Sequence, residues 1–177
     1  MQALREYRAR QLAGAPPTRG AGSAADTLHS RCAFYRDECG LNARVDPLTE
    51  RIVVTSGSTL AAVTVPALLA GRARIYMQHR GTAVGPIISH PRSSRWTFLV
   101  RPDVPTDPAT AAQLFARQVS VIGPGTPIAL PSPGPRQAGY RCWVHPPTGG
   151  LPSGLVVVQA VCACAPLDRY RPGGERL

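Results

Sequence analysis

The sequence predicts a mixed α+β fold in which a central, mostly antiparallel sheet is flanked by helices. Short β-branched and aromatic runs alternate with Ala- and Leu-rich stretches, but without a strict strand–helix–strand order. The 177 residues include 17 glycines and 19 prolines, which indicates many turns and short elements. We expect one globular domain at residues 26–165, between a flexible tail rich in Arg, Ala, Gly and Pro at residues 1–25 and a C-terminal tail at residues 166–177.

The N-terminal half of this domain is expected to contain two helices and two strands. Asp26 or Thr27 can cap a helix that runs to about Cys39 and ends at Gly40. The polar segment 42–50 predicts a turn. The next elements are two strands and, behind Pro66, an Ala-, Leu- and Arg-rich helix, expected at residues 51–55, 60–65 and 67–79.

The C-terminal half is organised around residues 96–100, an apolar run of β-branched and aromatic residues that predicts a buried strand. The Gly-, Pro- and Ser-rich segment 85–94 predicts a turn leading into it. The helix that Asp107 and Pro108 open has an apolar stripe consisting of Ala112, Leu114 and Phe115. Three more strands are expected at residues 119–122, 127–130 and 140–144, and the run 155–164 after Ser153 is either a strand or a buried helix.

The chain is strongly basic. All 20 basic residues are arginines, against 10 acidic residues, so the net charge is +10. This balance favours a polyanionic partner, such as nucleic acid, an anionic membrane surface or an acidic protein. No acidic residue lies between Arg51 and Pro102, so positive charge accumulates there without a local counter-charge.

Three features of the sequence favour a cytoplasmic protein without a membrane partner. The longest apolar run, residues 60–71, is interrupted by Thr64 and Pro66 and is too short to span a bilayer. The N-terminus is charged and lacks the apolar core of a secretion signal. Five cysteines, an odd number without small-scaffold spacing, fit a reducing compartment. Nothing in the sequence predicts an oligomeric state.

Arginines gather around the strand predicted at residues 96–100. Because side chains alternate along a strand, Arg95 and Thr97 share one face and Trp96 lies on the other, so a buried Trp96 would leave Arg95 facing outward. We expect an anion-binding face here, with a solvated rim of charges as the alternative. The residues expected to bind nucleic acid are Arg92, Arg95, Arg101, Arg72, Arg74, Arg80 and His90.

The order of motifs from residue 30 to residue 160 resembles the primase–polymerase (prim-pol) domain of actinobacterial replication proteins, in a reduced, stand-alone form. A Gly turn leads to a strand ending in Val63-Thr-Val-Pro66, a helix follows, and Gly85-Pro then precedes the strand segment Ser94-Arg-Trp-Thr-Phe98. A helix, a strand, a Gly turn and the Ala-Leu-Pro-Ser-Pro segment at residues 129–133 complete the order. The resemblance implies a prim-pol-like fold that handles nucleic acid or nucleotides.

The carboxylates that this family needs have no counterpart here. Nucleotidyl transfer in the family uses two metal ions, held first by an Asp-x-Asp strand whose counterparts are Ala62 and Thr64. The family's Ser-x-His motif is matched by Ser94-Arg-Trp96, and its last Asp is matched by Ser120. The only acidic residues from position 51 to position 167 are Asp103 and Asp107. The comparison therefore implies a domain with no nucleotidyl transfer, no metal and no other cofactor.

The spacing of other reactive residues disfavours further enzyme classes. No serine lies in a G-x-S-x-G elbow, and the histidines share no metal-ligand spacing. His145 precedes two prolines and is expected in a surface turn, while His90 either helps to contact an anion or is simply solvated. Trp96 and Trp143 are either core residues or stacking platforms for bases. The cysteines, which also lack the spacing of a zinc knuckle and are expected to pack as small apolar residues, are Cys32, Cys39, Cys142, Cys162 and Cys164.

The sequence thus predicts a catalytically inactive, primase/polymerase-like domain that binds nucleic acid or nucleotide through an Arg-rich face. The alternative is a small protein-interaction or regulatory module, with an acidic protein as partner and no nucleic-acid role. Arginines gathered on one concave face would favour the first hypothesis. Scattered arginines together with a large exposed apolar patch would favour the second.

Overall fold

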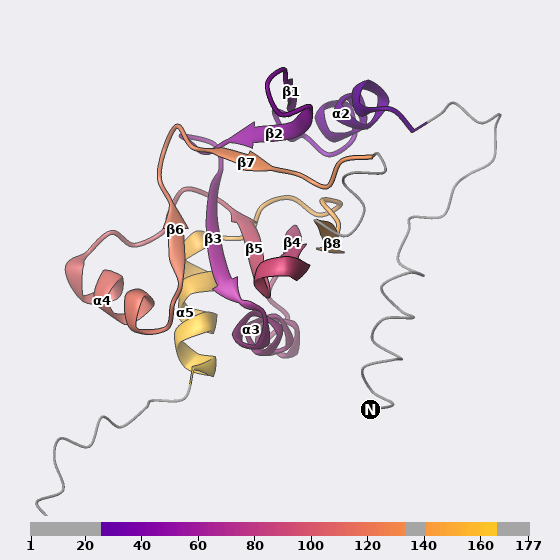
Figure 1. The fold of residues 1–177 in the computed structure, drawn as a ribbon. Coiled ribbons are helices and arrows are strands. Elements are labelled where there is room, and N and C mark those ends of the chain that lie inside the picture. The colour runs from indigo at the N-terminus through magenta and orange to yellow at the C-terminus, as the bar shows by residue number, and fades with distance from the viewer. Residues whose placement is uncertain (1–25, 134–140, 166–177) are drawn as a thin grey trace, which may run out of the picture.

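The computed structural model describes residues 26–133 and 141–165, and the predicted tails lie outside these ranges. Within them the chain forms four α-helices, a short 3-10 helix and two antiparallel sheets (Figure 1). The predicted α+β class is confirmed. In chain order the elements are α2 (Leu28–Asp37), β1 (Arg44–Asp46), β2 (Arg51–Thr55), β3 (Ala61–Pro66), α3 (Ala67–His79), β4 (Ile87–His90), η1 (Pro91–Ser93), β5 (Arg95–Val100), α4 (Pro108–Ala116), β6 (Ser120–Ile122), β7 (Pro127–Ala129), β8 (Cys142–His145) and α5 (Gly154–Cys164).

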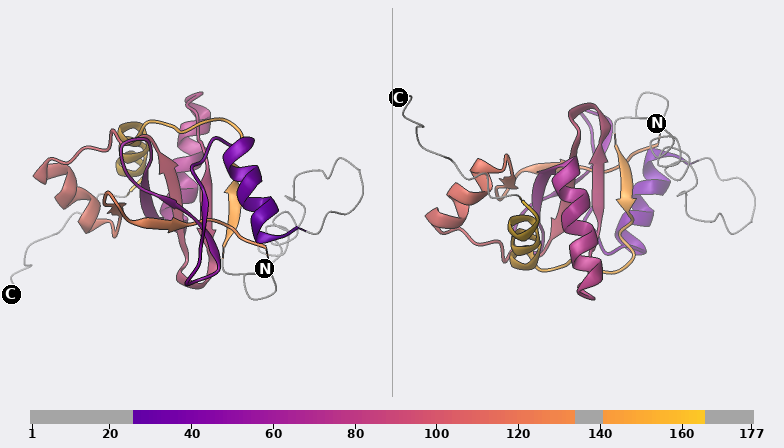
Figure 2. Two further views of the ribbon diagram at one scale, coloured as in Figure 1. Left: turned by 90° about the horizontal axis from the view of Figure 1, so that it is seen from above. Right: turned by 90° about the horizontal axis from the view of Figure 1, so that it is seen from below.

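These elements are stacked in layers. The five-stranded sheet, in the order β6-β3-β5-β4-β8, lies between α3 and α5 on one face and the three-stranded sheet β1-β2-β7 with α2 on the other (Figures 1 and 2). Seen from below in Figure 2, α3 and α5 lie across the sheet. None of the helices in the described ranges is long and apolar enough to cross a membrane.

The alternation of side chains along β3 and β5 produces two apolar cores. Val63, Val65 and Phe98 pack against α3 and α5, and none of the three is exposed to solvent. Ala62 and Leu99, the sequence neighbours of Val63 and Phe98, point between the two sheets. Trp96 is 6% exposed and belongs to the core on the side of α3 and α5. Alternation along the strand therefore places Arg95 on the opposite face.

The helix ends agree with the capping residues that the sequence indicates. The Thr27 side chain accepts a hydrogen bond from the Ser30 amide in a capping box at the start of α2. The Ser153 side chain accepts from the Val156 amide at the start of α5, and Asp103 accepts from the Ser153 hydroxyl and the Gly154 amide. Residues 155–164, which were open between strand and helix, are therefore helical.

Two segments predicted as turns contain strands. Segment 42–50 includes β1, which pairs with β2 in a hairpin closed by the hydrogen bond from the Glu50 amide to the Asp46 carbonyl. Segment 85–94 includes β4, which lies between β5 and β8. Polar residues are tolerated in β1 because it is an edge strand, and β4 was hidden by the Gly and Pro residues on either side of it.

Three side-chain placements also differ from expectation. Phe115 is 85% exposed and Ala112 is also exposed, whereas Leu114 is 4% exposed, so the stripe predicted on α4 is wrong at Ala112 and Phe115. The reason is that α4 lies beyond the edge strand β6 and has a narrow contact with the core (Figure 1). His145 is the last residue of β8, opposite Ile87, and does not lie in a surface turn.

Candidate functional site

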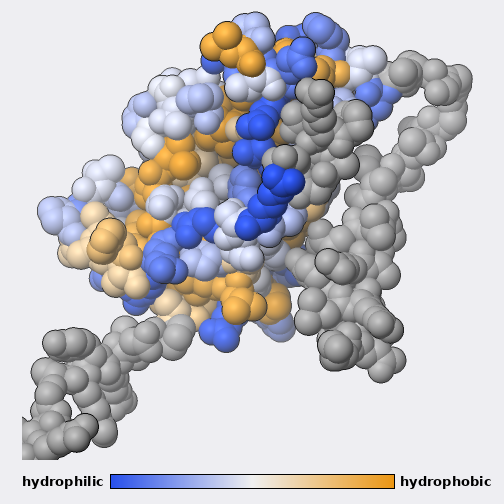
Figure 3. All heavy atoms as spheres, in the orientation of Figure 1, coloured by the Kyte–Doolittle hydropathy of each residue, from blue (hydrophilic) through white to orange (hydrophobic). Residues whose placement is uncertain are grey.

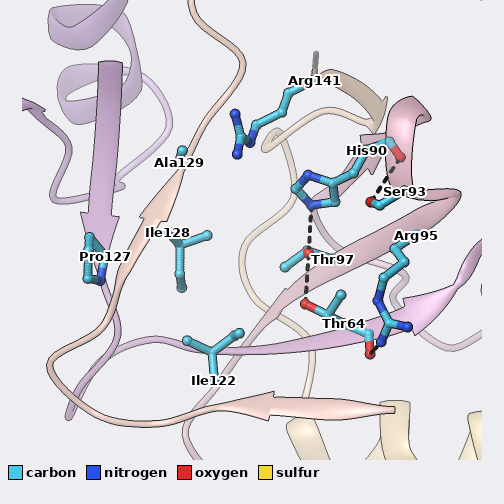
Figure 4. Close-up of a pocket in the computed structure, with 10 residues that line it drawn as sticks. All are labelled: Thr64, His90, Ser93, Arg95, Thr97, Ile122, Pro127, Ile128, Ala129 and Arg141. Atoms are coloured by element: carbon cyan, nitrogen blue, oxygen red, sulfur yellow. Dashed lines mark hydrogen bonds between the residues drawn. The ribbon is translucent and has the colours of Figure 1, made fainter. Parts of the chain in front are cut away.

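A pocket with a volume of about 270 Å³ opens between the two sheets, beside β7. One wall is apolar and comes from β6 and β7, with Ile122, Pro127, Ile128 and Ala129. The opposite wall is polar and consists of Thr64, His90, Ser93, Arg95, Thr97 and Arg141. Figure 4 shows the two walls facing each other, and Figure 3 shows hydrophilic side chains gathered in the middle of one face next to apolar ones.

The polar wall arises where the apolar alternation of three strands stops. Ala62, Ile88 and Leu99 fill the space between the sheets, and none of the three is exposed. On each of these strands, the residue two positions away on the same face is polar. These residues are Thr64 in β3, His90 in β4 and Thr97 in β5, and strand pairing places them next to one another. Across the strands, Thr64 is paired with Thr97, and His90 with Arg95.

Three of these side chains form a hydrogen-bonded chain. His90 Nε2 lies 2.8 Å from Thr97 Oγ1, and Thr97 Oγ1 lies 2.9 Å from Thr64 Oγ1 (Figure 4). Thr97 is only 3% exposed, so its hydroxyl depends on these two partners. The chain fixes the orientation of the imidazole at the edge of the pocket.

Arg95 combines a structural contact with a position in the pocket wall. Its Nη2 donates to the backbone carbonyl of Thr64 at 3.0 Å and to that of Gln118 at 2.6 Å. These bonds connect β5 to β3 and to the turn after α4, and they hold the guanidinium beside the pocket. Its positive charge therefore acts on the pocket from a fixed place.

Arg141 is the second cation of the pocket and immediately precedes β8. Its Nε is buried and has no hydrogen-bond partner within the described ranges. Burial lowers the pKa of Arg141, and the nearby charge of Arg51 lowers it further. An anion would stabilise this buried guanidinium, because it would offset the positive charge and accept the hydrogen bond that Nε does not make with any described residue.

The pKa of His90 is lowered by its burial and by the positive charge of the pocket. Burial, followed by the charges of Arg141 and Arg95, lowers the pKa of His90 from 6.5 to about 4. The imidazole is therefore neutral at pH 7. A neutral histidine between two arginines, with no carboxylate among the lining residues in ranges 26–133 and 141–165, indicates a site that carries excess positive charge.

The structure brings together only some of the residues predicted to bind nucleic acid. His90 and Arg95 share the pocket, and Arg92 lies in η1 between them in sequence. Arg101 follows the opposite end of β5, where it lies 3.8 Å from Asp103. Of the remaining three, Arg72 and Arg74 are on α3, which covers the other face of the sheet, and Arg80 directly follows this helix. Their role in binding stays a prediction.

Arg141 was not predicted from the sequence to line a binding site, and neither Thr64 nor Thr97 was assigned to one. Thr64 and Thr97 could have been found, because each continues an apolar face of its strand with a hydroxyl. Arg141 gave no such signal, since β8 reaches the pocket only by pairing with β4, about fifty residues earlier. The positions matched to the family's metal-binding residues lie close together, because Thr64 pairs with Ser120 and follows Ala62 on the same face.

The cysteines do not extend this site. All five are free thiols, and burial raises the pKa of Cys142, so its thiol is protonated at neutral pH. In the ranges 26–133 and 141–165, no group of three or more His, Cys, Asp or Glu side chains is placed to hold a metal ion. Trp143, the other possible stacking residue, donates from Nε1 to the Tyr35 hydroxyl at 2.9 Å and packs edge-on against its ring.

The pocket is therefore described by its own chemistry: two guanidinium groups, a neutral imidazole and hydroxyls on one side, and apolar side chains on the other. Comparisons of the chain with protein-family models, with curated proteins and with solved structures found no match, so no relative assigns a family, a ligand or an activity to it.

Proposed function

We propose that the protein binds the phosphate of a nucleotide or nucleic acid in this pocket and does not catalyse nucleotidyl transfer. One observation carries the proposal: Arg95, Arg141 and His90 meet in a pocket in whose walls the described residues include no Asp or Glu. Guanidinium groups form strong, charge-assisted hydrogen bonds with phosphate oxygens. The apolar wall at Ile122 and Ile128 offers a surface for a sugar or base attached to that phosphate.

Substitution of Arg141 tests the proposal directly. Arg141→Gln removes the guanidinium whose Nε has no hydrogen-bond partner among the described residues, so we expect about tenfold or greater weakening of phosphate binding by calorimetry or fluorescence anisotropy. Arg36→Gln is the matched control, because Arg36 is exposed on α2, does not line the pocket and was not predicted to bind nucleic acid. Absence of binding to nucleotides and oligonucleotides at low salt would contradict the proposal.

The salt dependence of binding shows how many arginines contact phosphate. If only Arg95 and Arg141 do so, the plot of log K against log salt should have a slope of about −2 on duplex DNA. If the six arginines predicted from the sequence all take part, the slope should be about −5. We expect the smaller value, because Arg72 and Arg74 lie on α3 and Arg80 directly follows it.

The absence of nucleotidyl transfer is part of the proposal. Ala62, Thr64 and Ser120 are neighbours on β3 and β6, and none can supply the carboxylate that would hold a divalent cation between two oxygen centres. We expect no primer extension with Mg²⁺ or Mn²⁺ on any primer–template. Extension above that of a heat-inactivated control would show that the active site lies elsewhere in the chain.

The alternative of a protein-interaction module makes a different prediction. The most exposed large apolar side chains are Leu48 before β2, Leu68 on α3 and Phe115 on α4, which lie on separate elements. Because these three side chains come from different elements, nothing in the described ranges marks them as one docking patch. A protein partner recovered from native lysate equally well with and without nuclease would nevertheless support it.

A further inference from the structure

We propose that the pocket selects a terminal phosphomonoester, at the end of a nucleotide or of a nucleic-acid strand, over a phosphodiester within a strand. This inference rests on the proposed function, namely that the pocket binds phosphate. It goes beyond that function by naming the chemical class of phosphate that binds best. Three properties of the pocket support it: its charge, its hydrogen-bonding groups and its size.

The charge of the pocket matches a dianion. Arg95 and Arg141 contribute two positive charges, His90 is neutral at pH 7, and none of the described residues that line the walls is a carboxylate. A phosphomonoester carries a charge of about −1.5 to −2 at pH 7, because its second pKa is about 6. A phosphodiester carries only one negative charge per phosphate. Only the monoester therefore neutralises both guanidinium groups.

The chain His90–Thr97–Thr64 can serve an additional phosphate oxygen. The neutral imidazole has one N–H and each threonine has one O–H, which makes three hydrogens. The two hydrogen bonds of the chain, at 2.8 and 2.9 Å, use two of them. One hydrogen is left to donate outside the chain, whichever way the hydrogen bonds run. A terminal phosphate offers three non-bridging oxygens, whereas a diester offers two.

The size of the pocket suits the end of a chain. Its volume of about 270 Å³ is slightly below the range of about 300 to 1,000 Å³ that is typical of sites for drug-sized ligands. The apolar side chains of Ile122 and Ile128 face the polar wall and narrow the space between them (Figure 4). An internal phosphate would have to bring both of its flanking nucleosides past these walls, whereas a terminal phosphate brings one.

Paired ligands that differ only in the ester test this inference. Calorimetry in phosphate-free buffer would compare a nucleoside 5′-monophosphate with its methyl phosphodiester. It would also compare one short oligonucleotide carrying a 5′-phosphate, a 3′-phosphate or only hydroxyl ends. We expect the monoester and at least one of the phosphorylated ends to bind about tenfold more tightly than their partners, as the loss of a charge-assisted contact would predict.

Two variants locate the preference in the pocket. Arg141→Gln should abolish the preference for the monoester, and Thr97→Val, which interrupts the hydrogen-bonded chain, should reduce it. Arg36→Gln, which lies on α2 and does not line the pocket, should retain the full preference. Because the wild-type ligand pairs need no substitution, the test holds even if a variant fails to fold.

The outcomes separate the two proposals. Equal affinity of the wild-type protein for monoester and diester would overturn the preference and leave the phosphate-binding function in place. A preference that Arg141→Gln leaves unchanged in a folded protein would also overturn it, since the site would then lie elsewhere. Failure of every phosphate ligand to bind would overturn the proposed function itself.

Discussion

The two faces of the five-stranded sheet differ in how completely they are covered. Under α3 and α5, Val63, Val65 and Phe98 form a closed apolar core. On the other face, the second sheet and α2 cover an apolar core that gives way at one end to the pocket lined by Thr64 and Thr97. The same strands supply both faces. The candidate site therefore arises where one apolar face of the sheet changes to polar residues, while the opposite face remains covered by helices.

This difference has an energetic basis. Apolar side chains can be covered by another layer without further partners, whereas a buried hydroxyl or imidazole needs hydrogen bonds in place of water. On the pocket side, Thr97 meets this need through His90 and Thr64. The closed face is therefore expected to carry most of the stability, and the open face most of the binding.

The largest expected effect comes from opening the closed face. Phe98 is fully buried between the sheet and the two helices, so Phe98→Ala should lower the free energy of unfolding by about 3–5 kcal/mol. Urea denaturation measures this loss. A decrease of less than about 1 kcal/mol would show that the helical face is not the main stabilising core.

A smaller loss is expected from the polar face. Thr97→Val keeps the shape of the side chain but deprives His90 and Thr64 of their shared partner, and should cost about 1–3 kcal/mol. Thr97→Ser retains the hydroxyl and serves as the control, with a lower cost in the same urea experiment. If valine were tolerated as well as serine, the hydrogen-bonded chain would not stabilise the fold.

The pH dependence of stability should reveal the positive pocket. The pKa of His90 is about 4 in the folded protein, below its ordinary value of 6.5, so between these values the unfolded state binds more protons. The contribution of His90 is thus complete above pH 6.5 and is lost as the pH falls toward 4. The effect should be modest, because His90 is only half-buried and faces solvent through the pocket.

Two measurements check this expectation. Titration of the His90 imidazole by NMR should give a pKa near 4, and a bound phosphate should raise it by offsetting the charges of Arg95 and Arg141. In His90→Gln, the change in stability over this pH range should be smaller than in the wild type. An ordinary pKa for His90, unchanged by phosphate, would mean that the two arginines do not act on it.

The smallest effect is expected at the edge of the sheet, on α4. Phe115 is mostly exposed, so Phe115→Ser should change the free energy of unfolding by no more than about 0.5 kcal/mol. Its neighbour Leu114 is buried, and Leu114→Ala should cost about 2–5 kcal/mol. A larger loss for the phenylalanine than for the leucine would reverse the placement of this helix on the core.

Features that depend on neighbouring residues were predictable from the sequence. Thr27 and Ser153 act as helix caps, and the strands at β2, β3 and β5 lie close to the predicted ranges, because capping and side-chain alternation depend on a few adjacent residues. The same alternation predicted that a buried Trp96 would place Arg95 on the opposite face, where it lines the pocket. The charge of the chain likewise needed no structure.

The residues that form the site and the segments that pair depend on contacts between distant parts of the chain. The strands β1 and β4 exist because β2 and β5 lie beside them, and local residues there favour turns. The exposure of Phe115 depends on where α4 meets the sheet. Arg141 joins His90 because β8 pairs with β4 across a long stretch of sequence. These outcomes follow from hydrogen bonds and packing between distant segments, which a local sequence pattern does not encode.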